Sequence, residues 1–426
     1  MHAEPITCYR PRPEEAAEFA SLPYDVFTRA EAAAYVSCHP RSFLAIDRPE
    51  TAFSPVHDPY AEDVYEKAHE LLAARVSDGT LLRDGTRCYY LYRLRANGHE
   101  QTGIVAACSV DDYTNGIIRR HELTRPEKEA DRFRHIEATG CQTGPVFLAY
   151  HDNPVLEALV EAAKVAEPLF DFTDVRRVRH TVWRIARPAA VESLRMMLEH
   201  VGRAYIADGH HRMAASARVC QKMRTERGER HTGNEAYNYV LCALFPTSQL
   251  TVLPYHRVVS DAAGLSEEEL VRGIEEAGFS VGPRQQEGVM PAARGHIGMH
   301  AFGAWRELVA QDVPDDPVGG LDVSLLQDRV LGPVLGVSDS TSCERLGFVG
   351  GLATADEVAG RAGERGVAFT LFPTSLRELM DVADRGLIMP PKSTWLDPKL
   401  LSGLFIRRIN HCESHSDRTQ ERRPEE

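Results

Sequence analysis

The segment from Tyr205 to Ala215 constrains the fold more than any other part of the chain, because within a few residues it changes from a strand to a helix. Its first residues are apolar and end at Asp208. Gly209 then permits a sharp backbone turn that a side chain would obstruct. The run that begins at Arg212 has the composition of a helix. The sequence therefore predicts a strand, a tight turn and a helix in direct succession.

The beginning of this predicted helix has the properties of an anion site. The first turn of a helix exposes backbone N–H groups and carries a partial positive charge. His210, His211 and Arg212 stand at that end. We expect Gly209 to Arg212 to bind phosphate, an anion common at such sites. Asp208 is expected to hold Mg²⁺ or to orient a substrate hydroxyl, with His210 as a further candidate catalytic residue. In the alternative, Asp208 only caps the helix and both histidines lie on the surface.

The most densely charged stretch of the chain leads into another predicted helix. Thr124 is expected to cap this helix, with Pro126 in its first turn. Lys128 and Arg132 are four residues apart and share a helix face, and we expect them to bind phosphate. Glu122 is our candidate general base, because a carboxylate just before a basic face can take a proton from a hydroxyl. The alternative is a solvated helix with ion pairs along its surface.

The proline-rich run from Met389 to Gly403 is a third candidate. Its prolines restrict the backbone, and Lys392, Ser393 and Thr394 offer donors for an anionic oxygen, with Lys399 nearby. It is not a Walker loop, because the glycine-rich lead is missing. The alternative is a rigid strap over the core.

The order of predicted elements indicates the α+β class. A helix is expected from Tyr60 to Ser77, and a hairpin is expected around Asn97-Gly98. Strands and helices mix without strict alternation. The length of 426 residues allows two or three domains. Because the pattern changes near residue 260, we expect a catalytic region over 1–260, a C-terminal α+β domain over 261–410 and a disordered tail over 411–426.

Charge and cysteine usage limit the class of partner. The net charge of −13 argues against binding to nucleic acid or to an anionic membrane. No apolar run is long enough to span a bilayer, and the N-terminus lacks the pattern of a signal peptide. The nine cysteines are scattered and none forms a Cys-x-x-Cys pair, which fits reduced thiols. We expect a cytoplasmic protein, and the composition is compatible with a homodimer.

Several motifs, in order along the chain, resemble the large bacterial family called domain of unknown function 1015. They are Pro23-Tyr-Asp-Val26, His121-Glu-Leu-Thr124, Ala207-Asp-Gly-His-His-Arg212, Pro254-Tyr-His-Arg257 and Met389-Pro-Pro-Lys-Ser-Thr394. We name the residues Tyr24, Asp25, His121 and Thr124 of these motifs as candidates for substrate binding. For the first of these motifs, ordinary loop packing is the alternative.

The Asp-Gly-His-His-Arg run is also similar to the phosphate-binding turn of the ParB/sulfiredoxin fold, which includes free-serine kinases. This resemblance implies a ParB/sulfiredoxin-like core with additional α/β elements. It implies that Asp208 lies near the serine or a metal, that Gly209 to Arg212 surround the nucleotide phosphate, and that Glu122 is the base.

The sequence therefore predicts a nucleotide-dependent phosphotransferase. It would be a kinase that uses ATP or ADP with Mg²⁺ to phosphorylate free serine or a similar small hydroxyl compound. Two alternatives stay open. One is a ParB-like nucleotide-binding regulatory protein, and the other is a phosphate-ester hydrolase on the same fold.

Overall fold

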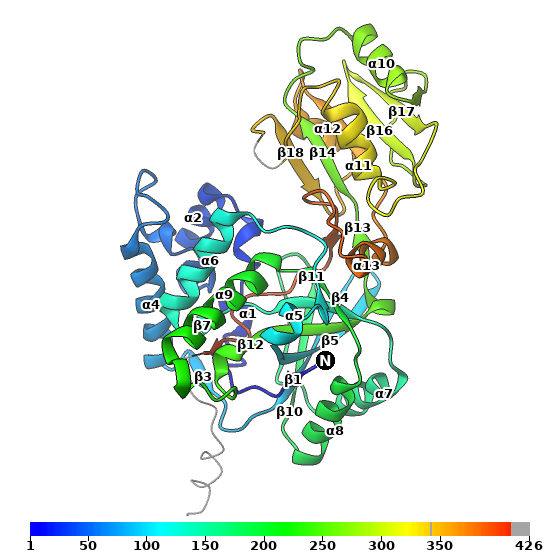
Figure 1. Ribbon diagram of the computed structural model, residues 1–426. Helices are drawn as coiled ribbons and strands as arrows, with labels where there is room; N and C mark the ends of the chain where they lie inside the picture. Colours follow the sequence, from blue (N-terminus) through cyan, green and yellow to red (C-terminus); the bar gives the residue numbers. More distant parts are fainter. Residues whose placement is uncertain (341–342, 410–426) are drawn as a thin grey trace, which may run out of the picture. The chain divides into compact units, whose positions relative to one another are not determined.

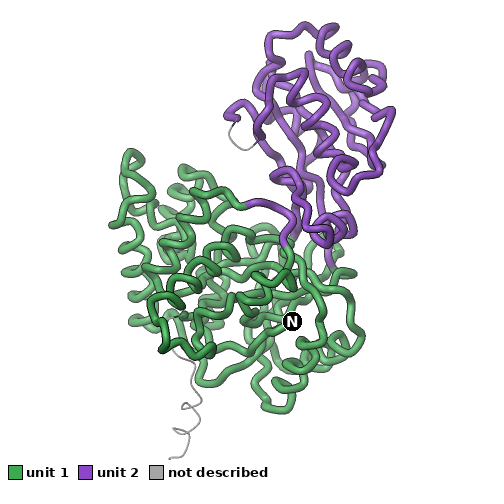
Figure 2. The backbone as a smooth tube through the Cα atoms, viewed as in Figure 1, with its two compact units in different colours: residues 1–119, 124–249, 398–426 green, residues 120–123, 250–397 purple. Residues whose placement is uncertain are grey.

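The computed structural model describes residues 1–340 and 343–409, and its elements form two compact units (Figures 1 and 2). Unit 1 comprises Met1–Arg119, Thr124–Gln249 and the described residues from Pro398 onward. Unit 2 comprises Arg120–Leu123 and Leu250–Asp397. The predicted tail, residues 411–426, lies outside the described residues. The expected domain boundary near residue 260 stays a prediction. In the structure, the chain passes from unit 1 to unit 2 between Gln249 and Leu250 and comes back to unit 1 at Pro398.

Unit 1 is built on a nine-stranded mixed sheet, which confirms the predicted α+β class. Eight strands lie in the order β6 (Ile118–Arg119), β11 (Ala204–Asp208), β8 (Val146–Tyr150), β12 (Tyr239–Pro246), β5 (His99–Ser109), β4 (Tyr89–Ala96), β10 (Arg179–Ile185) and β9 (Phe170–Thr173). The ninth strand, β1 (Ala3–Glu4), pairs with β5. Two small sheets join β2 (Tyr9–Pro11) with β3 (Leu81–Arg83), and β7 (Cys141–Gln142) with β21 (Arg407–Arg408).

Two local predictions in unit 1 are confirmed. Strands β4 and β5 form an antiparallel hairpin in which Ala96 pairs with His99. Asn97 and Gly98 make the turn at φ 50° and 77°, as a two-residue turn requires. The helix expected after Tyr60 is α4 (Glu62–Ser77), whose buried face carries apolar side chains such as Val64.

Helices cover one face of the unit 1 sheet. Side chains of α6 (Pro126–Thr139), α7 (Pro154–Ala163), α8 (Pro188–Glu199) and α9 (His210–Arg227) share one buried cluster with the strands β4, β5, β8, β11 and β12. The other α-helices in the described part of unit 1 are α1 (Ala16–Phe19), α2 (Arg29–Cys38), α3 (Leu44–Asp47) and α5 (Val110–Thr114). A second buried cluster joins α1, α3 and α4 to Ile406 near the described end of the chain. The C-terminal segment is therefore part of the core of unit 1.

That C-terminal segment packs against aromatic side chains of β4. Phe405 is fully buried, and its ring centroid lies 5.1 Å from that of Tyr90 and 5.7 Å from that of Tyr92. The backbone N–H of Leu401 donates to the Tyr92 hydroxyl at 3.4 Å. Residues 398–409 thus form a strap on unit 1, whereas residues 389–397 of the proline-rich run belong to unit 2.

The described part of unit 2 contains a six-stranded antiparallel sheet with four α-helices. The strands lie in the order β15 (Phe279–Val281), β17 (Ala304–Ala310), β16 (His296–Ala301), β19 (Val367–Leu371), β14 (Tyr255–Val259) and β18 (Leu346–Gly350). The helices are α10 (Glu267–Glu276), α11 (Asp322–Leu326), α12 (Ala355–Ala362) and α13 (Leu376–Asp384). A short pair, β13 (Val252–Leu253) with β20 (Trp395–Leu396), completes the unit.

Candidate functional site

The predicted strand, turn and helix are all present in unit 1. Strand β11 ends at Asp208, Gly209 has φ 96° as the N-cap residue, and α9 begins at His210. The helix continues to Arg227. The backbone N–H of Met213 donates to the Gly209 carbonyl at 3.0 Å, which closes the first helical turn.

Gly209 is needed at the turn for two physical reasons. A φ of 96° is strained for any residue with a side chain. A Cβ atom here would also lie 3.0 Å from Nε and Nη2 of Arg212. The guanidinium of Arg212 therefore lies directly over the turn, and its Nη1 donates to the Pro145 carbonyl. Gly144 completes this close approach, because its Cβ atom would lie 3.4 Å from Nη1 of Arg212.

Asp208 lies between two cations. Lys399 Nζ donates to Asp208 Oδ2 at 2.6 Å, and Arg212 Nη2 lies 3.9 Å from Asp208 Oδ1. The side chains are 13% exposed for Lys399, 15% for Arg212 and 22% for Asp208, so partial burial strengthens these interactions without removing the site from solvent. Two positive groups and one carboxylate leave this trio with a net charge of +1.

Hydrogen bonds on both sides of Lys399 fix its backbone in unit 1. The carbonyl of Pro398 accepts from Gln101 Nε2 at 3.4 Å, and Leu401 N donates to the Tyr92 hydroxyl. Ser402 N donates to the Ser21 carbonyl at 2.8 Å. The sequence indicates Lys399 only as a further donor near Lys392, and it does not predict the pair with Asp208. No local signal reveals the pairing, because Asp208 precedes Lys399 by 191 residues.

Arg212 also lines a small cavity of unit 1, which has room for little more than a water molecule. Its other lining residues include Tyr24, Asp47, Arg132, Gly144 and Ser402. The structure thus places Tyr24, a predicted substrate residue, in one cavity with two predicted phosphate-binding arginines. Asp25, the neighbour of Tyr24, is exposed.

Arg132 is held inside this cavity wall by acidic partners. Its guanidinium donates to Asp131 Oδ2 at 2.9 Å and to Asp47 Oδ1 at 3.2 Å, and it lies 4.0 Å from the ring centroid of Tyr24. Burial alone would lower the pKa of Arg132, but the two carboxylates outweigh burial and raise it. Burial and the charge of Arg132 both lower the pKa of His135, whose Nε2 lies 2.9 Å from the Ile46 carbonyl. His135 is therefore neutral beside the charged Arg132.

The charged helix α6 begins one residue later than the cap prediction requires. Its N-cap is Arg125, without a side-chain cap, so the expected Thr124 cap is wrong. Pro126 at the first helical position has no N–H to offer, and the Thr124 hydroxyl instead donates to Glu129 Oε2 at 2.8 Å. The backbone N–H of Arg125 donates to His211 Nε2 at 3.0 Å. Lys128 is half-buried on the same helix.

Five predicted residues lie in unit 2, namely His121, Glu122, Lys392, Ser393 and Thr394. His121 accepts a hydrogen bond from Met389 N at 2.8 Å through its carbonyl, and its Nε2 lies 3.3 Å from Thr394 Oγ1. Ser393 is buried, and its hydroxyl donates to the Pro390 carbonyl at 2.6 Å. This hydrogen bond stabilises the turn, and the role of Ser393 as a phosphate ligand stays a prediction.

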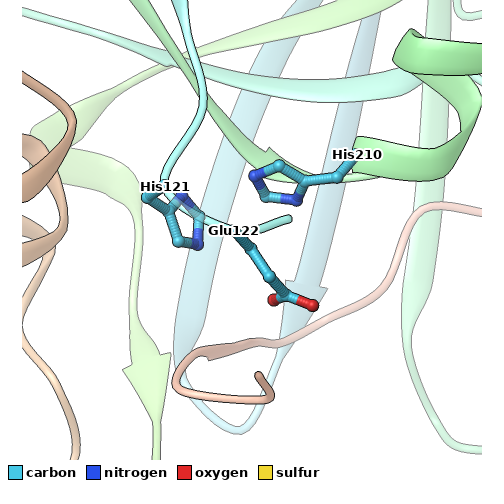
Figure 3. Close-up of side chains that lie close together, drawn as sticks. All are labelled: His121, Glu122 and His210. Atoms are coloured by element: carbon cyan, nitrogen blue, oxygen red, sulfur yellow. The ribbon is translucent and has the colours of Figure 1, made fainter. Parts of the chain in front are cut away.

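The same turn of unit 2 is held by a buried arginine. Arg257 donates to the carbonyls of Pro391 and Lys392 at 3.1 and 3.0 Å, and burial lowers its pKa to about 10. Lys392 itself has φ 59°, which is uncommon for a residue with a side chain. Three predicted residues are labelled in Figure 3, namely His121 and Glu122 of unit 2 and His210 at the start of α9 in unit 1.

While Lys399 and Arg212 contact Asp208, its oxygens offer no free position for a magnesium ion. Mg²⁺ prefers carboxylate and phosphate oxygens, but Asp208 Oδ2 is already paired with the ammonium of Lys399 and Oδ1 faces Arg212. A second cation at either oxygen would be repelled by these charges. The positive charge beside the turn comes from the chain's own side chains.

A family model described as protein of unknown function (DUF1015) matches residues 3–324. The chain belongs to this family. The DUF1015 match includes the β11–α9 turn and the charged helix α6, and it ends before the segment that carries Lys399. No curated protein matches the chain.

Solved structures similar to this DUF1015 chain include a C-terminally truncated SbnI from Staphylococcus aureus, with 14% identity and a TM-score of 0.38 over 74% of this chain and 92% of that one. A mutant free serine kinase in complex with ADP has 14% identity and a TM-score of 0.36, over 69% and 87%. A conserved hypothetical protein from Pyrococcus furiosus has 12% identity and a TM-score of 0.36, over 71% and 95%. TM-scores this low carry no argument for a shared activity.

The described helices do not meet the requirements for a membrane-spanning helix. None of them combines the length and the apolar character that a bilayer-spanning helix needs.

Proposed function

We propose that this chain is a nucleotide-dependent phosphotransferase that phosphorylates a hydroxyl group of a small compound such as free serine. The observation that carries the proposal is the arrangement at the start of α9. There the glycine turn, Arg212 and Lys399 bring positive charge to one point of the unit 1 surface. A helix N-terminus combined with fixed cations favours a phosphate group.

The proposed reaction needs positioning and charge neutralisation more than covalent chemistry. The substrate hydroxyl oxygen forms a bond to the terminal phosphorus of ATP or ADP, and the bond from that phosphorus to the bridging oxygen breaks. The nucleotide leaves with one phosphoryl group fewer. The hydroxyl proton passes to a carboxylate, for which Glu122 and Asp208 are the candidates. Arg212 would neutralise negative charge that develops on the transferred group.

The small pocket beside Arg212 offers polar contacts for one end of an acceptor. It is lined by polar and charged groups of unit 1, including Ser402 and the buried Arg132. His210, His211, Lys128, Lys392 and Thr394 stay predictions as ligands of the nucleotide, and so do Asp25, His121 and Thr124 as ligands of the acceptor.

The test is a product assay on the full chain. Purified protein is incubated with ATP or ADP, Mg²⁺ and a panel of amino acids and other small alcohols, and products are identified by mass spectrometry. We expect a phosphorylated acceptor with the wild type and at least a hundredfold slower formation with Arg212→Ala. Arg218→Ala is the matched control, because Arg218 is an exposed arginine of the same helix that packs over Phe133.

Two outcomes would contradict the proposed kinase. Release of free phosphate without any phosphorylated acceptor would indicate a hydrolase instead. Binding of nucleotide without turnover for any acceptor, with the wild type indistinguishable from Asp208→Asn, would favour a nucleotide-binding regulatory protein.

A further inference from the structure

Lys399 donates a hydrogen bond to Asp208, yet it comes from the strap formed by residues 398–409. Its Nζ lies 2.6 Å from Asp208 Oδ2, and Asp208 immediately precedes the Gly209 turn. The family match ends before this strap. The pair spans 191 residues of sequence and joins two parts of the same compact unit.

We propose that Lys399 is a further phosphate-contacting residue, and that its ammonium moves from Asp208 to the phosphoryl oxygens when a nucleotide binds. The inference rests on the proposed function and deepens it. Asp208 then has the role of a positioning residue, which keeps the ammonium at the turn until an anion arrives. In this arrangement, Lys399 supplies positive charge at the carboxylate that the sequence assigned to Mg²⁺.

Three features of the pair support this movement. The backbone on both sides of Lys399 is fixed by Gln101 and Tyr92, so the four-carbon stem alone has to move. The pair is only partly buried, at 13% and 22% exposure, so exchange of one anion for another does not expose a dry core. A phosphoryl group carries more negative charge than a carboxylate and offers more acceptor oxygens.

A purely structural ion pair predicts a different pattern of mutant effects. If Lys399 and Asp208 only hold the strap in place, removal of either partner weakens the site in the same direction. If Lys399 exchanges between Asp208 and phosphate, the two substitutions act in opposite directions. Removing Asp208 takes away a competing anion beside the nucleotide, while removing Lys399 takes away a ligand.

The experiment is calorimetric titration of the full chain with ADP, and separately with inorganic phosphate, in the presence of EDTA. We expect Lys399→Met to weaken ADP binding about 10- to 100-fold, the range of a lost charge-assisted hydrogen bond. Lys399→Arg keeps the charge and should stay within about threefold of the wild type. Asp208→Asn should tighten ADP binding roughly threefold or more. Lys67→Met is the control, because Lys67 lies on α4, where its half-exposed side chain pairs with Glu70.

Each outcome decides between the proposals. Weaker binding for both Lys399→Met and Asp208→Asn would make the pair structural and overturn the exchange. Unchanged binding for Lys399→Met with a wild type that binds ADP would overturn the role of Lys399 alone. A wild type that binds neither ADP nor phosphate, both in EDTA and in a repeat titration with Mg²⁺, would overturn the proposed function itself. Thermal unfolding of each variant identifies any that fail to fold, and Lys399→Gln then replaces Lys399→Met.

Discussion

Replacement of Gly209 by alanine should damage the candidate site through the backbone and through Arg212 together. At φ 96° an alanine pays a conformational penalty of about 1–2 kcal/mol. Its Cβ atom would also lie 3.0 Å from two nitrogens of the Arg212 guanidinium. That group must shift by a few tenths of an ångström or leave the turn. We expect a total loss of about 2 kcal/mol in the free energy of unfolding.

Gly116 offers a matched control for the backbone part of this loss. It lies in the same unit at φ 75°, and a Cβ atom there would meet no atom within 4 Å. Gly116→Ala should therefore cost only the conformational penalty, about 1 kcal/mol, and should leave phosphate binding unchanged. The difference between the two variants isolates the contact between residue 209 and Arg212.

The assay combines urea unfolding, followed by circular dichroism, with titration of inorganic phosphate. Gly209→Ala should unfold at lower urea than Gly116→Ala and should bind phosphate at least about tenfold more weakly, because displacement of Arg212 removes a charge-assisted hydrogen bond. If Gly209→Ala is as stable as the wild type and binds phosphate equally well, the reasoning about the turn is refuted.

Three further predictions concern the buried charged groups. Arg132→Met leaves two carboxylates without their buried partner, and we expect the free energy of unfolding, measured by thermal denaturation, to fall by about 3–5 kcal/mol. A decrease below about 1 kcal/mol would contradict the buried network. His256 accepts from a backbone N–H, and burial lowers its pKa to about 4 from 6.5. Because the unfolded state then binds more protons, stability should fall by about 3 kcal/mol as the pH drops from 6.5 to 4, and His256→Gln should lose that part of the pH dependence. Arg257→Met removes three hydrogen bonds to carbonyls and should destabilise unit 2 by about 2–3 kcal/mol. Amide hydrogen exchange in unit 2 should become faster, and an unchanged exchange rate would contradict this role of Arg257.

Local patterns predicted the parts of the fold that depend on neighbouring residues. The Asn97-Gly98 turn and the helix α4 follow from turn chemistry and helical periodicity. The β11–α9 turn follows from one glycine between an apolar strand and a helix former. The same local logic misplaced the cap of α6, because Pro126 favours the first helical position and so makes Arg125 the cap residue.

Which residues meet at the candidate site depends on contacts between distant parts of the chain, and no local sequence pattern predicts them. Asp208 meets Lys399 across 191 residues, and Arg132 meets Asp47 across 85. Spacing on α6 indicated that Lys128 and Arg132 share a face, but not that Arg132 is buried against two carboxylates and the ring of Tyr24. In the sequence, Lys399 is one donor among several in a proline-rich run. Its contact with Asp208 depends on the packing of residues 398–409 in unit 1.

The central claim is that the turn between β11 and α9 binds a phosphate group through Arg212. Calorimetric titration of ADP into the wild type and Arg212→Ala tests it most directly, with Arg218→Ala as the control on the same helix. We predict that the wild type and the control bind with equal affinity and that Arg212→Ala binds at least about tenfold more weakly. Equal affinity in all three proteins would contradict the claim.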